Sequence, residues 1–125
     1  MRVVVAVVVI AALAAGCDDS TARGYSAEKF KRCIEREHTD VITLTRGKGY
    51  TAALLWWPTF AEWVYFYKTA EAASAQRARL RVATTRNRRI LRQLLRTQRA
   101  NTLVFAPAQK DWLAPIQDCL ERARV

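Results

Sequence analysis

The chain contains one histidine, three cysteines and four glycines among 125 residues, and these low numbers argue against several kinds of site. One histidine offers too few converging ligands for a typical zinc site. No serine occupies the nucleophile-elbow motif of a hydrolase, and no glycine-rich loop leads into a helix as phosphate-binding loops do. The sequence therefore predicts no enzyme, no metal and no cofactor. The polar group Glu35, Glu37, His38 and Asp40 is interpreted as solvated charges at a helix end.

Acidic residues are also scarce, since 11 of them face 21 basic residues and leave a net charge of +10. Such a surplus favours anionic partners. It is concentrated in residues 77–99, which hold nine arginines and no acid. On a helix, one stripe of this segment would carry Arg88, Arg92, Arg96 and Arg99. The stripe either binds anionic lipid or a phosphate-bearing wall polymer, or it is the solvated side of a helix whose leucines pack on a sheet.

A long apolar run occurs only at the N-terminus. Arg2 precedes an unbroken apolar run from Val3 to Ala15, which has the length of a secretory h-region and is short for a membrane-spanning helix. The run closes on Leu13-Ala14-Ala15-Gly16-Cys17, where small residues suit cleavage by a membrane peptidase.

This ending resembles the lipobox of bacterial lipoproteins, although Ala14 stands where leucine is commoner. The resemblance covers residues 1–17 and implies that residues 1–16 are a signal peptide, that the sulfur of Cys17 receives a diacylglycerol, and that the leader is then cut so that Cys17 becomes the first residue. It implies a lipoprotein of the cell envelope, anchored to the outer face of the bacterial cytoplasmic membrane. An ordinary cleaved leader would give a secreted protein instead. Because an exported protein rarely meets its own genome, nucleic acid is not expected as a partner.

The chain after the leader divides into a polar tether, residues 17–24, and a single domain, residues 25–125. With Cys17 acylated, Cys33 and Cys119 remain, and an even number of cysteines in an oxidising compartment favours a disulfide. Each of the two has apolar residues three positions before it and one after it, the spacing of one helical face. Helices packed through these faces would join the sulfurs, whereas the alternative is two buried free thiols.

Hydrophobic periodicity predicts the elements of this domain. Gly47 and Gly49 suit a hairpin turn, Ser26 suits a helix start, and Asn101 suits a helix end. The expected elements are a helix over 27–37, strands over 41–45, 50–57 and 62–68, helices over 70–82 and 86–98, a strand over 102–106 and a last helix containing Cys119. The predicted fold is an α+β domain with a four-stranded, mostly antiparallel sheet, helices on one face and one disulfide, loosely resembling ferredoxin-like domains in element order.

Aromatic residues are the other concentrated feature, because eight of the twelve lie within residues 50–67. On a strand, Trp63, Tyr65 and Tyr67 share one face, and the residues between them share the other. An open Trp63/Tyr65/Tyr67 face would stack on sugar rings or contact a partner protein, whereas the alternative is that helices cover it and leave Val64 partly exposed. The predicted function is non-catalytic binding of an envelope component or a membrane-protein partner, with the arginine segment as the alternative binding surface.

Overall fold

The computed structural model describes residues 24–38, 41–56, 61–107 and 113–125. The expected signal peptide, Cys17 and Asp40 lie outside these ranges. Within them, no helix combines the length and the apolar character needed to cross a bilayer.

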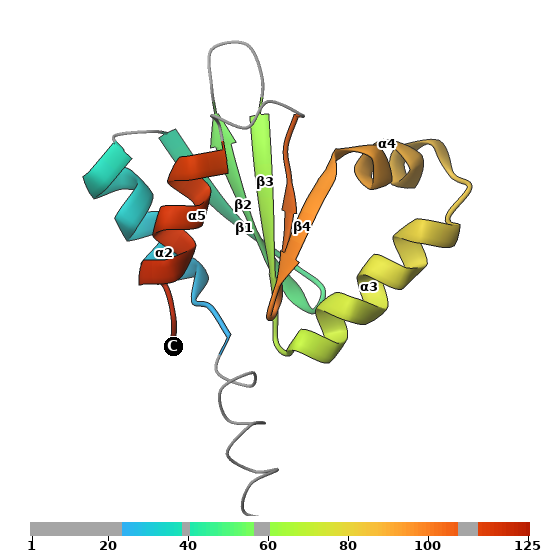
Figure 1. Ribbon diagram of the computed structural model, residues 1–125, viewed down its shortest axis with the longest axis horizontal. Helices are drawn as coiled ribbons and strands as arrows, with labels where there is room; N and C mark the ends of the chain where they lie inside the picture. Colours follow the sequence, from blue (N-terminus) through green and yellow to red (C-terminus); the bar gives the residue numbers. More distant parts are fainter. Residues whose placement is uncertain (1–23, 39–40, 57–60, 108–112) are drawn as a thin grey trace, which may run out of the picture.

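The described residues form one α+β domain, which confirms the predicted fold class (Figure 1). The predicted hairpin and the predicted helix start at Ser26 are present. Ser26 Oγ accepts a hydrogen bond from Lys29 N, and Thr69 Oγ1 accepts one from Ala72 N. The elements in chain order are α2 (Ala27–Cys33), the π-helix η1 (Ile34–His38), β1 (Val41–Gly47), β2 (Tyr50–Trp56), β3 (Ala61–Tyr67), α3 (Ala70–Val82), α4 (Arg86–Leu94), β4 (Leu95–Arg99), β5 (Thr102–Phe105) and α5 (Leu113–Arg122).

The sheet has five strands rather than the predicted four, in the order β1-β2-β3-β5-β4. The additional strand is β4, which occupies residues expected to continue a helix to residue 98, so that prediction was wrong. The helix ends at Leu94 because Leu95 pairs with Phe105 and the backbone then follows β5 in an antiparallel ladder. A register shift between Leu95 and Thr97 marks a bulge at the start of this ladder.

Every neighbouring pair of strands in the sheet is antiparallel. A ferredoxin-like domain has the element order β-α-β-β-α-β, whereas β1, β2 and β3 follow one another here with no helix between them. The loose resemblance to that fold therefore does not extend to the topology. The chain between β3 and β5 contains β4, so β5 returns antiparallel to β3 instead of completing a parallel crossover.

Helices cover both faces of the sheet, so the expectation of helices on one face was wrong (Figure 1). One layer consists of α2, η1 and α5, and it packs on the face that contains Val64 and Phe66. The other layer contains α3 and α4 and packs on the opposite face, where Leu103 and Phe105 are buried. The side chains of β3 explain the two layers, because successive residues of a strand point to opposite faces of the sheet. Large apolar or aromatic side chains of β3 therefore lie on both faces, and each face needs a covering layer.

The predicted disulfide is confirmed. Cys33 in α2 and Cys119 in α5 are bonded, with their Cα atoms 5.5 Å apart and a separation of 86 positions in the sequence. Both residues are buried in the core of this layer, beside Phe30 and Ile116. The bridge therefore ties the first helix of the domain to the last.

Candidate functional site

The four arginines expected on one helical stripe are divided between two elements. Arg88 and Arg92 lie in α4, whereas Arg96 and Arg99 lie in β4, so the prediction of one helical stripe carrying all four was wrong. Three of the four make structural contacts. Arg92 Nη1 donates to Arg81 O at 3.1 Å. Arg96 Nε donates to Ala106 O at 2.6 Å, and the Arg99 guanidinium pairs with the Glu121 carboxylate at 2.8 Å.

Helix α4 is the most exposed element of the domain. None of its residues is buried, and it extends from the far end of α3 at the outer corner of the molecule (Figure 1). The side chain of Ile90 is 45% exposed, and Val82 at the end of α3 is 79% exposed. Helix α4 thus presents apolar side chains and arginines together at the surface.

Charge is divided unequally between the two helical layers. Residues 27–38 and 113–125 contain five acidic residues and six lysines and arginines, and most of these charges form ion pairs with one another. Residues 70–99 contain nine arginines and only one acid, Glu71. Of these nine, only Arg99 has an ion-pair partner in the described part of the chain. The positive field of the domain therefore comes mainly from the layer of α3 and α4.

The Trp63, Tyr65 and Tyr67 side chains lie on the face covered by α3, and all three are half-buried. The alternative that left Val64 partly exposed was wrong, because both Val64 and Phe66 are buried by the disulfide-linked layer. The β2–β3 register places Tyr50 opposite Tyr67 on the same face as Tyr65. Three tyrosines from two neighbouring strands therefore lie side by side.

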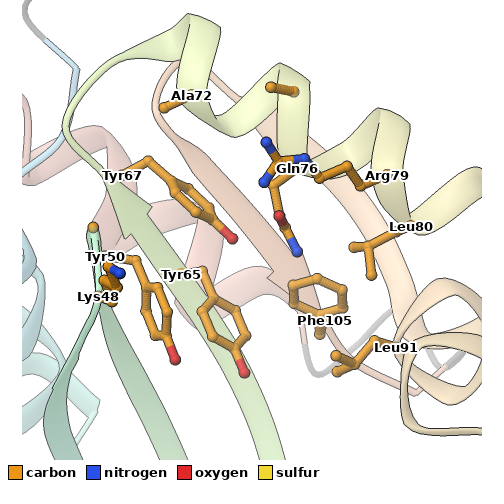
Figure 2. Close-up of a pocket in the computed structure, with 12 residues that line it drawn as sticks. Lys48, Tyr50, Tyr65, Tyr67, Ala72, Gln76, Arg79, Leu80, Leu91 and Phe105 are labelled. Carbon is orange, nitrogen blue, oxygen red and sulfur yellow. The ribbon is translucent and has the colours of Figure 1, made fainter. Parts of the chain in front are cut away.

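These tyrosines form one wall of a cavity of about 390 Å³, within the ~300–1,000 Å³ typical of small-molecule sites. We call this cavity the tyrosine pocket. Its other wall is α3, where Ala72 and Ala75 are small enough to leave the space open. Figure 2 shows the Gln76 amide directed between the Tyr67 hydroxyl and the Phe105 ring. The lining residues are Lys48, Gly49, Tyr50, Tyr65, Tyr67, Ala72, Ala75, Gln76, Arg79, Leu80, Leu91 and Phe105.

Ring packing fixes the orientation of the tyrosines. The Tyr65 ring meets Phe105 edge-on with the centroids 5.2 Å apart, and Tyr50 meets Tyr65 edge-on at 5.3 Å. Edge-to-face contacts of this kind are favourable because the positive ring edge meets the negative ring face. The pocket wall is therefore held in place by aromatic contacts that extend from β2 through β3 to β5.

Among the described residues, the lining of the tyrosine pocket is cationic and contains no carboxylate. Lys48 comes from the β1–β2 turn and Arg79 from α3, and neither forms an ion pair with the residues that the structure describes. Burial, together with smaller contributions from the neighbouring Tyr65 and Tyr50 phenols, raises the pKa of Tyr67 to about 12. Burial also raises the pKa of Tyr65. Near neutral pH the phenols of Tyr65 and Tyr67 are therefore protonated and available as hydrogen-bond donors.

Sequence analysis identified Tyr65 and Tyr67 but missed the rest of this lining. Tyr50 was detectable from hairpin register, since a turn at residues 48–49 places it opposite Tyr67. Gln76 and Arg79 are three residues apart and share a helical face. No local pattern, however, indicates that this face lies over the tyrosines.

The polar group around His38 forms a network of ion pairs with α5. His38 Nε2 lies 3.2 Å from Asp118 Oδ2, and Arg122 pairs with both Asp118 and Glu37 at 3.3 Å. Asp118 also lies close to the sulfurs of Cys33 and Cys119. Because those sulfurs are bonded to each other, they provide no thiolate for a metal ion.

The fold and its cavity together define a small, disulfide-closed α+β domain with a cationic, tyrosine-lined pocket. Comparison with protein-family models, with curated proteins and with solved structures gives no match for this chain.

Proposed function

We propose that this protein is a bacterial lipoprotein, anchored through Cys17 on the outer face of the cytoplasmic membrane, that binds an envelope component without catalysing a reaction. The observation that carries the binding role is the tyrosine pocket, which combines aromatic walls, hydrogen-bonding groups and two cations without an acidic partner in its lining. Pockets of this type, with a few polar groups among apolar walls, are typical ligand sites.

The location is supported by two independent features. The leader ends in small residues before Cys17, and the Cys33–Cys119 disulfide fits an oxidising compartment outside the cytoplasm. Two or three acyl chains on Cys17 would hold the protein stably, because each buried methylene contributes about 0.8 kcal/mol.

Intact mass spectrometry of the protein extracted from its native membrane tests this location. The expected species begins at Cys17, carries acyl mass and gains two hydrogen atoms on reduction. A matched Cys17→Ser variant should lack the acyl mass and keep residues 1–16. An unprocessed chain with three free thiols would contradict the proposal.

The second candidate function is attachment of the α3/α4 layer to an anionic surface, either lipid headgroups or a phosphate-bearing wall polymer. The observation that favours it is α4, which has no buried residue and exposes both the apolar Ile90 and the arginines Arg88 and Arg92. Basic amphipathic helices of this kind lie on anionic membranes, and each basic side chain near the surface contributes about 1 kcal/mol.

Co-sedimentation with phosphatidylglycerol and phosphatidylcholine vesicles tests the second candidate, using a Cys17→Ser chain that cannot be acylated. Reversing the charge of Arg88 and Arg92 to Glu should lower binding to phosphatidylglycerol more than tenfold and leave binding to phosphatidylcholine unchanged. The matched control reverses Arg32 and Arg36, which are exposed on the disulfide-linked layer. An equal loss of phosphatidylglycerol binding in the two double variants would show that only the net charge matters and would contradict the second candidate.

A further inference from the structure

We infer that the tyrosine pocket binds a sugar ring that carries an anionic group, either a carboxylate or a phosphate. The inference rests on the proposed binding function and specifies the class of ligand. Its three supports are the character of the pocket walls, the placement of the cations and the size of the cavity.

The pocket walls combine apolar ring surface with hydrogen-bonding groups, as a sugar combines C–H surface with hydroxyl groups. Tyr50, Tyr65 and Phe105 present aromatic carbon, on which the C–H side of a sugar ring can pack. The Tyr67 hydroxyl and the Gln76 amide converge on the same space (Figure 2). A phenol both donates and accepts a hydrogen bond, and an amide provides both kinds of group, so together they match vicinal hydroxyls.

The cations select an acidic sugar over a neutral or basic one. Lys48 lines the pocket from the β1–β2 turn and Arg79 lines it from α3, so an anionic ligand meets a positive charge at either of two walls. The Tyr65 and Tyr67 phenols are neutral near pH 7 and burial raises their pKa values further from it, and no carboxylate among the described lining residues opposes an anion. A cationic ligand would meet two like charges, and a neutral sugar would leave both cations without a counter-charge.

The cavity of about 390 Å³ lies in the lower part of the range for ligand sites. This volume suits one or two rings rather than a long oligosaccharide. The proposed ligand class includes free acidic monosaccharides and the terminal residue of an acidic polymer. It also includes uronic acids, which carry a carboxylate, and sugar phosphates.

Titration of the full-length acylated protein in detergent micelles tests the inference, with calorimetry for affinity and ¹⁵N–¹H spectra for location. The probes are glucuronate, glucose 1-phosphate, glucose and inorganic phosphate. At least one anionic sugar should shift the amide signals of Tyr50, Tyr67 and Arg79 and bind at least ten times more tightly than glucose or phosphate alone. Preference between glucuronate and glucose 1-phosphate identifies the anionic group. Equal binding of glucose, equal binding of phosphate, or no shift at these residues with any probe would each overturn the inference.

Two charge-removing variants and a matched control locate the effect. Lys48→Gln and Arg79→Gln should each lower the affinity for the anionic sugar about fivefold or more without changing the affinity for glucose. Tyr65→Phe, which keeps the ring and removes the hydroxyl, should leave the fold intact and weaken both sugars. The control is Arg81→Gln on the same helix, outside the pocket lining, and it should bind as the wild type does. A loss as large in Arg81→Gln as in Arg79→Gln would attribute the effect to the general positive field and overturn the inference.

Results that refute the proposed ligand class differ from results that refute the proposed function. An acylated, disulfide-bonded chain that binds none of these sugars would refute the ligand class and leave the location intact. An unacylated chain with free thiols would refute the location, whatever the sugars do.

Discussion

The side chain of Asn101 holds the backbone of Tyr25, which is 76 residues away in the sequence. Asn101 Oδ1 accepts from Tyr25 N at 2.7 Å, and Asn101 Nδ2 donates to Tyr25 O at 3.2 Å and to Tyr67 O at 2.8 Å. Gly24, with a φ of 57°, permits this approach, because a Cβ there would lie 2.5 Å from Asn101 Oδ1. One buried amide thus connects the start of the domain to the β4–β5 turn and the end of β3.

Replacing Asn101 with Ala should lower the free energy of unfolding by about 2–3 kcal/mol, because three hydrogen bonds are lost and a partly buried N–H is left without its partner. Asn101→Asp should also destabilise, since a carboxylate keeps the acceptor but lacks both donors and faces two carbonyl oxygens. Guanidinium denaturation checks both changes. The control is Asn87→Ala on exposed α4, which should stay within about 0.5 kcal/mol of the wild type. A loss in Asn101→Ala no greater than in the control would contradict the role assigned to this amide.

The Cys33–Cys119 bridge closes a loop of 86 residues. Closing a loop of this length removes unfolded-chain entropy worth about 4–5 kcal/mol. The Cys33→Ala, Cys119→Ala double variant should therefore unfold at a much lower guanidinium concentration than the wild type. Cys17→Ser, which leaves the bridge in place, should unfold as the wild type does. A double variant less than about 1 kcal/mol below the wild type would show that the bridge contributes little.

The elements that the sequence predicted correctly are those whose signals are local. The β1–β2 hairpin follows from two apolar runs around Gly47 and Gly49, and α3 is bounded by Thr69 and Val82 as expected. The disulfide followed from matching helical faces, because a face apolar at every third or fourth residue must pack on something.

The errors arose where tertiary contacts override a local pattern. Residues 94–99 continue a helical leucine and arginine pattern, yet pairing with β5 makes Leu95–Arg99 a strand and places Asn101 in a turn. Coverage of the sheet on both faces depends on where α3 and α5 return, which no local spacing encodes. The same reason explains why only part of the tyrosine pocket lining was identified from the sequence. Tyr65 and Tyr67 share one strand face, whereas Gln76 and Arg79 come from a separate helix.

Ala100 occupies a left-handed conformation in the β4–β5 turn, with a φ of 46°. A residue with a Cβ is strained there, whereas glycine is not. Ala100→Gly should therefore raise the unfolding free energy by about 0.5–1 kcal/mol, after the greater entropy of an unfolded glycine is subtracted. The matched control is Ala78→Gly on the exposed side of α3, where the same change should cost about 1 kcal/mol. Thermal unfolding of the two variants checks the opposite signs, and a lower midpoint for Ala100→Gly would contradict the expectation.

Burial of the Tyr67 phenol predicts a loss of stability at alkaline pH. Its pKa is raised from the ordinary value of 10.0 to about 12 in the folded protein, so the folded state holds this proton more tightly than the unfolded state does. The associated stability is fully present below pH 10 and is lost as the pH rises towards 12. The difference between the absorbance titrations of the wild type and Tyr67→Phe at the tyrosinate band should show one group with a midpoint near pH 12. Between pH 10 and 12, Tyr67→Phe should lose less stability than the wild type, because phenylalanine has no proton to release. Parallel losses in the two proteins, or a midpoint near pH 10, would place Tyr67 in contact with solvent and open that wall of the pocket.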